Sequence, residues 1–167
     1  MMTMTDTAIT LHPPRVDTAS VAPDALRAQL AVETYVRRSR LEPSLIELVK
    51  VRASTLNGCA YCVDMHTKDA RAAGESEQRL YAVPVWRETP FFSERERAAL
   101  AWTEIVNDIG GGVSDEAYAA VREEFDEAEV VDLTMAVIAI NGWNRLAIAF
   151  RTPVGSYVPP RRPAATG

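Results

Sequence analysis

The two cysteines, Cys59 and Cys62, are the only ones in the chain and stand three residues apart. Asn57-Gly58, just before them, predicts that one helix ends there and that Cys59 opens the next. A cysteine in a first helical turn faces unpaired backbone N–H groups and the positive end of the helix dipole, and both favour the thiolate. Two sulfurs one turn apart can also meet, so the spacing predicts a dithiol able to form a disulfide.

A histidine and a glutamate stand where they could move protons for this pair. His66 follows Cys62 by four residues and shares its helix face, where it could deprotonate Cys62 or stabilise the thiolate. If the two helices form an antiparallel hairpin, His66 lies level with about position 49, and Glu47 is about 3 Å further along. The sequence therefore predicts a relay from Glu47 through His66 to Cys62, with Cys59 beside Cys62.

Two other interpretations of these residues stay open. The cysteines could be small core residues without a redox role. A structural zinc site needs four ligands, which Cys59, Cys62 and His66 would supply only together with Glu47. The redox pair is the favoured hypothesis because Glu47 and His66 stand in register with it, and no metal is expected.

The elements around these residues are predicted to be helices. No stretch alternates cleanly as a strand would, so we expect an all-α fold of about six to seven helices. Ser93 to Glu96 form a capping-box pattern. The last predicted helix is apolar nearly all round, which predicts burial on most sides and hints at an oligomer. The predicted helices cover residues 23–38, 43–57, 60–73, a short stretch from 76 interrupted at Pro84, 93–109, a stretch from 114, and 129–150.

Composition bounds the class of protein. The chain of 167 residues suggests one domain, with 47% hydrophobic and 25% charged residues. A net charge of −5 argues against nucleic-acid binding and against an anionic membrane surface. Two cysteines are too few for a secreted disulfide scaffold, and no targeting signal or membrane span is expected, so the predicted location is cytoplasmic. We expect a flexible arm over 1–22, a helical domain over 23–152 and a Pro-rich tail over 153–167.

Other residues have open roles. Tyr61, between the cysteines, is expected near any substrate entrance. The tryptophans are expected in the core or at a subunit interface, and the polar residues of the last helix need partners, either at the site or between helices. These residues are Trp86, Trp102 and Trp143, and Asn141, Asn144 and Arg145.

Glu47, the Cys59-x-x-Cys62 pair and His66, within "LNGCAYCVDMHTKDA", resemble the AhpD-like alkylhydroperoxidase branch of the carboxymuconolactone decarboxylase superfamily. The resemblance covers roughly residues 40 to 153. It implies a helical protomer that assembles into homo-trimers or homo-hexamers, and a dithiol peroxidase chemistry without metal, haem or other cofactor. The cysteine pair argues against lactone decarboxylation, because that branch of the superfamily lacks it.

The resemblance also assigns roles. Cys62 would be the peroxidatic cysteine, Cys59 the resolving one, and Glu47 with His66 the proton relay. Helix-end reasoning alone favours Cys59 as the more acidic thiol, whereas the hairpin geometry favours Cys62 as the attacking one. Tyr61 stands where the best-studied branch carries a histidine, which removes one relay group.

The function hypothesis is a dithiol peroxidase or disulfide oxidoreductase acting on a small hydroperoxide or disulfide. An external dithiol, such as a lipoyl or thioredoxin-like protein, would reduce the pair. The alternative hypothesis is a non-catalytic oligomeric protein that uses the same dithiol for redox sensing or partner binding.

Overall fold

The computed structural model describes residues 12–160, and this part of the chain contains eight α-helices, two 3-10 helices and no strand. The all-α prediction is confirmed. The number of α-helices exceeds the expected six to seven because a single-turn helix precedes Pro23. The α-helices are α1 (Thr18–Val21), α2 (Pro23–Arg37), α3 (Pro43–Leu56), α4 (Ala60–Ala72), α5 (Glu77–Ala82), α6 (Glu94–Asn107), α7 (Asp115–Arg122) and α8 (Glu127–Phe150), and the 3-10 helices are η1 (Val83–Glu88) and η2 (Ile109–Gly111).

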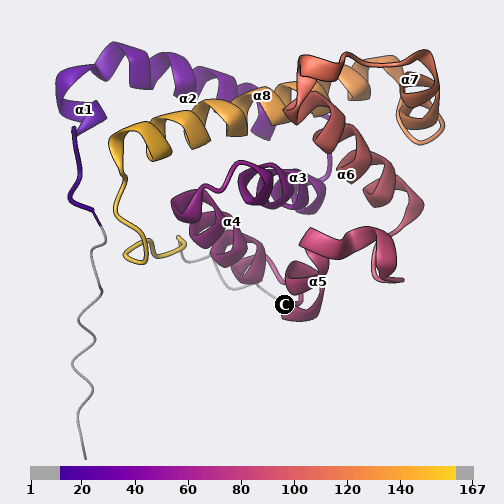
Figure 1. Ribbon diagram of the computed structural model, residues 1–167, viewed down its shortest axis with the longest axis horizontal. Coiled ribbons are helices and arrows are strands. Elements are labelled where there is room, and N and C mark those ends of the chain that lie inside the picture. The colour runs from indigo at the N-terminus through magenta and orange to yellow at the C-terminus, as the bar shows by residue number, and fades with distance from the viewer. Residues whose placement is uncertain (1–11, 161–167) are drawn as a thin grey trace, which may run out of the picture.

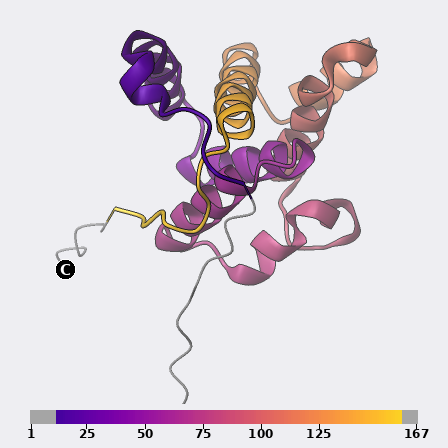
Figure 2. The ribbon, with the colours of Figure 1, turned by 60° about the vertical axis from the view of Figure 1, so that its left-hand side comes forward.

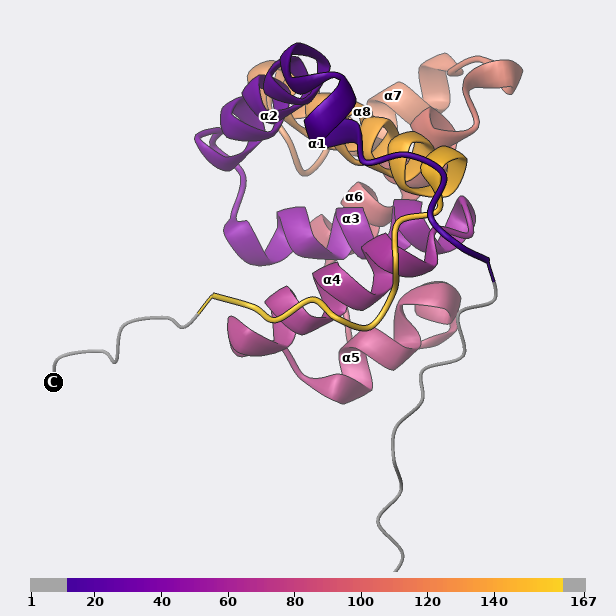
Figure 3. The ribbon, with the colours of Figure 1, turned by 90° about the vertical axis from the view of Figure 1, so that its left-hand side faces the viewer.

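Helix α3 lies at the centre, packed against α4, α6 and α8 (Figure 1). Helices α2 and α8 run beside each other on one side of it, and α4 and α5 lie on the other side (Figure 3). The view in Figure 2 shows α3 crossing beneath α2, α8 and α6. The central helix is therefore enclosed, and α4 packs on it as the second arm of a hairpin.

Three apolar clusters meet on α3. Val49 packs in the cluster with Leu133 of α8, whereas its neighbour Leu48 packs with Leu100 of α6. Ala53, one turn later, joins a third cluster around the two cysteines. Adjacent residues of a helix point about 100° apart, and α3 is buried in several directions. Its apolar positions therefore do not form one simple stripe.

The helix ends follow local sequence signals. The capping box at Ser93 and Glu96 is present as predicted. A second one, formed by Asp126 and Glu129, starts α8 two residues earlier than expected. Gly58 turns the chain between α3 and α4 with φ of +67°, a conformation that other residues rarely adopt, so the predicted hairpin turn is confirmed.

Helix α8 is buried on one side only, so the expectation of burial on most sides is wrong for the single chain. Its inner side packs against α2, α3 and α6 as a core helix does. In the described part of the chain it is the one helix long and apolar enough to cross a membrane. Its outer side exposes Val131, Ile138 and Ile148, which are 57%, 49% and 48% accessible.

Segments at both ends pack on the helical body. The backbone N–H of Arg15 donates to the carbonyl of Phe150 at 3.0 Å, so the arm contacts the end of α8. Lys68 donates to the carbonyl of Tyr157 at 3.1 Å, and the Tyr157 hydroxyl donates to Asp69 at 2.7 Å. Residues 12–22 and 153–160 therefore have defined contacts, and the rest of the predicted arm and tail lies outside the described residues.

Candidate redox site

The hairpin turn brings both cysteines to the start of α4, facing α3 and α8. Cys59 is the N-cap of α4 and Cys62 lies in its first turn. Both are free thiols, 1% and 2% exposed. They pack with Ala53 of α3 and Ile140 of α8. The pair therefore lies at a junction of three helices rather than on a surface loop.

The contact predicted between Glu47 and His66 is present. The Nδ1 atom of His66 lies 2.9 Å from Oε2 of Glu47, with the ring buried between α3 and α4. This contact leaves Nε2 as the ring nitrogen for proton exchange with another group. His66 and Cys62 line the same cavity, and within residues 12–160 no hydrogen bond joins His66 to either thiol.

The cavity on the Cys62 side has a volume of about 320 Å³. Tyr61 lines it, as expected from its place between the cysteines. Apolar side chains contribute most of the remaining wall, with Glu33, Arg37 and His66 as its ionisable groups. Such a cavity suits a small organic molecule. The apolar contributors include Leu30, Met65, Trp143 and Leu146.

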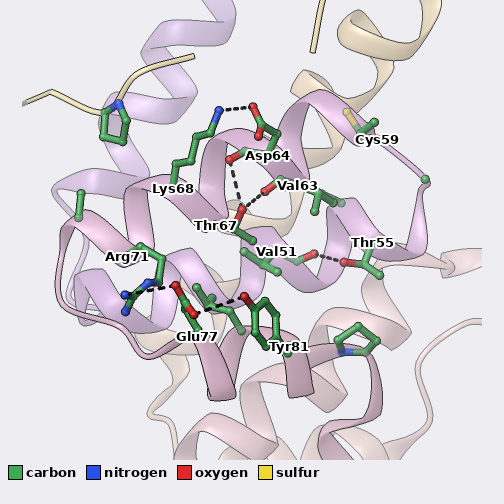
Figure 4. A pocket seen from close by; sticks show the side chains of 17 residues that line it. Val51, Thr55, Cys59, Val63, Asp64, Thr67, Lys68, Arg71, Glu77 and Tyr81 are labelled. Atoms are coloured by element: carbon green, nitrogen blue, oxygen red, sulfur yellow. Dashed lines mark hydrogen bonds and ion pairs between the residues drawn. The ribbon is translucent and has the colours of Figure 1, made fainter. Parts of the chain in front are cut away.

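Cys59 lines a different and larger hollow, a groove of about 1270 Å³ between α4 and α5. Figure 4 shows Cys59 at one end of this groove and Arg71 with Glu77 toward the other. Cys62 does not line the groove, and Cys59 does not line the cavity. The two residues thus line separate hollows.

The two thiols have different acidities. A hydrogen bond from the Cys62 side chain, together with the backbone N–H groups of Cys62 and Tyr61, lowers the pKa of Cys59 to about 7 despite its burial. The pKa of Cys62 is raised because its thiol donates to Cys59, lies buried and faces the Cys59 charge. The first negative charge of the reduced pair therefore resides on Cys59, as helix-end reasoning predicted.

A buried ion pair next to the site was missed by the sequence analysis. Lys50, 1% exposed, donates to Glu33 at 2.5 Å, and the indole of Trp143 donates to the same carboxylate at 3.3 Å. Burial opposes ionisation of Glu33, but the charge and hydrogen bond of Lys50 bring its pKa below the ordinary value. Glu47, three residues from Lys50, is the partner that sequence spacing suggests, and it pairs with His66 instead. The sequence did carry one signal for this buried ion pair: Lys50 is a charged residue beside the apolar Val49, at a position of α3 that is buried.

A cluster of amides joins the site to the helices behind it. Asn144 donates to the Ser54 hydroxyl at 3.0 Å and accepts from Asn57 at 2.8 Å. A hydrogen bond from Asn144 also lowers the pKa of each thiol. Asn141 accepts from Asn57 at 3.2 Å and donates to Asn107 at 2.9 Å. Of the polar residues of α8, Asn144 thus reaches the site, whereas Asn141 joins α8 to the neighbouring helices.

One group of side chains within residues 12–160 has the spacing of a metal site. Ligand atoms of Glu47, His66 and Asp69 lie within 4.8 Å of one another. The group contains neither cysteine, so the zinc set of Cys59, Cys62, His66 and Glu47 considered from the sequence is not assembled. Asp69 also accepts the hydrogen bond from Tyr157.

Comparisons with known proteins agree with this architecture. The model of the carboxymuconolactone decarboxylase family matches residues 23–104. The uncharacterised protein YdfG of Bacillus subtilis is 43% identical over 136 residues, which are 81% of this chain and 92% of YdfG. The chain belongs to the carboxymuconolactone decarboxylase family.

Solved structures place it more narrowly. The crystal structure of ATU0492 from Agrobacterium tumefaciens has a TM-score of 0.83 and 44% identity, and covers 87% of this chain and 100% of that one. The function of ATU0492 is unknown, and its name associates it with the antioxidant defence protein AhpD. The debrominase Bmp8 has the same fold, with a TM-score of 0.75 and 18% identity over 83% of this chain and 75% of that one. The chain is thus a member of the AhpD-like branch.

Proposed function

We propose that the protein is a cofactor-free dithiol peroxidase that reduces organic hydroperoxides. The observation that carries the proposal is the shared cavity of Cys62 and His66, with Glu47 bonded to His66 behind them and Cys59 hydrogen-bonded to Cys62. The cavity has room for a small apolar molecule beside Cys62, and His66 in the same cavity can serve as the proton acceptor.

The proposed reaction starts at Cys62. Its sulfur attacks the outer oxygen of the hydroperoxide, the O–O bond breaks, and the alcohol leaves with a proton. Cys62 becomes a sulfenic acid. The Cys59 sulfur then attacks the Cys62 sulfur, water leaves, and the pair becomes a disulfide. Each turnover uses two electrons, which an external dithiol restores.

The different acidities of the two thiols indicate that His66 acts as a general base. Cys62 holds its proton because Cys59 carries the first charge. A base must therefore remove the Cys62 proton during attack, and His66 lines the same cavity. Glu47 fixes the ring by accepting from Nδ1 and stabilises the imidazolium that forms. Lys50 favours the Cys62 thiolate by its charge.

The direct test mixes the reduced protein with cumene hydroperoxide and follows thiol loss, with Cys59→Ser and Cys62→Ser measured in parallel. The proposal expects rapid thiol loss in the wild type, a sulfenic acid that persists in Cys59→Ser, and no reaction in Cys62→Ser. Wild-type rates in Cys62→Ser would reassign the attacking thiol to Cys59. Wild-type rates in both variants would end the enzyme hypothesis.

The alternative is a redox sensor or partner-binding protein that uses the same dithiol. Turnover separates the two, since a peroxidase consumes many equivalents of hydroperoxide when dithiothreitol is present and a sensor consumes one. A family fold can also host unrelated chemistry, as the debrominase Bmp8 illustrates. The free thiols fit a reducing compartment, so we propose a cytoplasmic location.

Glu47→Gln tests the relay. An amide cannot stabilise the imidazolium form of His66 as a carboxylate does, so the rate of thiol oxidation by hydroperoxide should fall by about 10²-fold or more. The measurement is the pH–rate profile of oxidation from pH 5 to 9. Glu42→Gln is the control, because Glu42 is the N-cap of α3 and pairs with Arg95 away from the site. An unchanged profile in Glu47→Gln would remove Glu47 from the relay.

A further inference from the structure

Asn144 lies on the face of α8 that covers the two thiols. Ile140, four residues before it, and Ala147, three residues after it, both pack in the cluster around the cysteines. Residues at these spacings share one face of a helix, so Asn144 lies between them and faces the same way. Asn144 is 1% exposed, and a polar group buried to this extent needs hydrogen-bond partners.

Two neighbours fix the orientation of the Asn144 side chain. Its Oδ1 accepts from the Asn57 amide at 2.8 Å, and its Nδ2 donates to the Ser54 hydroxyl at 3.0 Å. Ser54 is next to the pair, because its carbonyl accepts from the backbone N–H of Cys59 at 2.9 Å. Within residues 12–160, Ser54 is the oxygen acceptor of this nitrogen. An amide nitrogen has two hydrogens, so its second N–H is left for the sulfurs.

Both sulfurs receive a hydrogen bond from this amide. In Cys59 the bond adds to the donors that lower the pKa of the thiol. In Cys62 it opposes burial and the Cys59 charge, which raise the pKa of that thiol. One neutral donor thus contacts both reacting atoms of the pair.

We propose that the Asn144 amide is a catalytic hydrogen-bond donor that stabilises the negative charge on each sulfur as the pair reacts. The inference rests on the proposed peroxidase function and adds a residue to its machinery. Its geometric basis is a buried amide that Asn57 and Ser54 hold in place and that α8 presents to the thiols.

The need for this donor arises when Cys62 loses its proton. In the reduced pair, Cys59 carries the first charge and accepts a hydrogen bond from the Cys62 thiol. When His66 takes the Cys62 proton, that hydrogen bond is lost and a second negative charge forms beside the first. The Asn144 N–H remains as a donor in contact with the sulfurs, whereas Lys50 favours the Cys62 thiolate by its charge alone.

The subsequent steps balance with the charge in this place. The Cys62 thiolate attacks the outer oxygen of the hydroperoxide, the O–O bond breaks, and the alkoxide leaves with the proton held by His66. The Cys59 thiolate then attacks the sulfur of the sulfenic acid. The S–O bond breaks, and hydroxide leaves as water after taking a proton from solvent. The Asn144 amide donates throughout and is not itself changed.

The test measures the thiols without hydroperoxide, by ultraviolet absorbance of the thiolate in the reduced full chain. Asn144→Leu replaces the amide by an apolar group of similar size. The midpoint of the Cys59 titration should rise from about 7 by about one pH unit, because a donor to the charged form is lost. The rate of thiol oxidation by cumene hydroperoxide should fall by about tenfold or more. An unchanged midpoint and rate would overturn the proposal.

Asn141→Leu is the matched control. Asn141 lies one turn earlier on α8 and belongs to the same amide cluster, but it bonds to Asn57 and Asn107 and lowers the pKa of neither thiol. Its substitution should leave the midpoint at about 7 and the oxidation rate within about twofold of the wild type. Equal effects of Asn141→Leu and Asn144→Leu would show that the cluster acts through packing, which would overturn the proposal.

A second measurement uses the unaltered chain, so it does not require Asn144→Leu to fold. Nuclear magnetic resonance of isotope-labelled protein follows the side-chain amide protons of Asn144 from pH 5 to 9. A hydrogen bond strengthens when its acceptor becomes charged, so one of these protons should shift with a midpoint at about 7. The shift should disappear after diamide oxidises the pair. Amide protons of Asn144 that do not respond to pH, or respond no more than those of Asn141, would overturn the proposal.

Failure of this proposal and failure of the proposed function give different results. An active peroxidase in which Asn144→Leu changes neither the midpoint nor the rate would contradict the role of Asn144 alone. A wild type that does not consume cumene hydroperoxide would contradict the proposed function and, with it, a catalytic role for Asn144. A raised midpoint in Asn144→Leu of that inactive protein would still establish Asn144 as the donor to the thiolate.

Discussion

Cys59 and Cys62 are both thiols with nearly the same burial, yet their acidities differ because one accepts hydrogen bonds and the other donates. Cys59 accepts hydrogen bonds from Cys62 and from the first N–H groups of α4, whereas Cys62 donates. The hydrogen bond from Cys62 to Cys59 therefore distinguishes the two sulfurs first, and the N–H groups at the start of α4 add to the difference. Reactivity toward hydroperoxide need not follow acidity, because His66 lies on the Cys62 side.

Titration of Cys59 tests this account. A lowered pKa means that the thiolate fraction rises as the pH increases through about 7, rather than through about 9. The rate of alkylation of Cys59 by iodoacetamide should therefore increase from pH 6 to 8 and then level off. Cys62→Ala removes the donor and should move the midpoint upward, while Cys62→Ser retains a donor and should hold it low. A midpoint near 9 in the wild type would contradict the assignment.

The Lys50–Glu33 pair makes a prediction about stability. Glu33→Gln leaves the charge of Lys50 buried without its counter-charge, which should lower the free energy of unfolding by about 3–5 kcal/mol. The measurement is urea denaturation of the reduced protein. The double variant Glu33→Leu with Lys50→Met removes both charges and should recover most of the loss. A change below about 1 kcal/mol in Glu33→Gln would show that the pair contributes little.

At the residue scale, the sequence predicted the contacts that are local to one hairpin. The contact between Glu47 and His66 was predicted because a short hairpin turn determines which residues of its two helices lie side by side. Glu33 and Trp143 were not found, because each lies on a helix whose position depends on the packing of the whole chain. The pairing of Lys50 with Glu33 was not found, because spacing alone cannot tell which way a side chain points on an enclosed helix.

At the element scale, three helices meet behind the cysteines through amide side chains. Asn57 ends α3, Asn107 ends α6, and Asn141 and Asn144 come from α8. Asn57 donates to all three of the others, so its amide links the hairpin turn to both neighbouring helices. Asn57 therefore contributes to holding the dithiol in place relative to α8, together with the bond from Asn144 to Ser54.

Asn57→Ala should lower the free energy of unfolding by about 1–3 kcal/mol, because the buried Asn144 and the partly buried Asn107 and Asn141 each lose a hydrogen bond. Denaturant unfolding measures this loss. Thr34→Ala is the control, since the exposed Thr34 hydroxyl bonds only to Leu30 of its own helix and its removal should cost less than about 0.5 kcal/mol. Equal effects of the two substitutions would show that the amide cluster does not join the helices energetically.

Helix positions were predicted well because they depend on local signals. The capping box at Ser93 and the Asn57-Gly58 turn are each determined by a few neighbouring residues. The start of α8 was placed two residues late because its capping box at Asp126 lies inside a run of acidic residues, where one acidic N-cap does not stand out. The packing of α3 between three clusters depends on long-range contacts, which periodicity does not specify.

At the scale of the whole molecule, the outer side of α8 is notable because it exposes large apolar side chains. Val131 and Ile138 are seven residues apart on this face, and Ile148 is exposed nearby, turned by about 80° around the helix from Ile138. The helix has 24 residues and is about 36 Å long, enough to form the centre of an interface of about 800 Å² on each partner. We propose that this face contacts other copies of the chain in a homo-trimer or homo-hexamer.

Ile138→Glu tests the proposed assembly, because a carboxylate at the centre of an apolar interface has no counter-charge and must be desolvated. The mass measured by light scattering should fall from that of a trimer or hexamer to that of a monomer. Val158→Glu is the matched control, since Val158 is 80% exposed away from α8 and its substitution should leave the mass unchanged. A wild-type mass of one chain, or an unchanged oligomer in Ile138→Glu, would show that this side of α8 faces solvent. The dithiol does not lie on this side, so both variants should retain thiol oxidation by hydroperoxide, which separates loss of assembly from loss of the site.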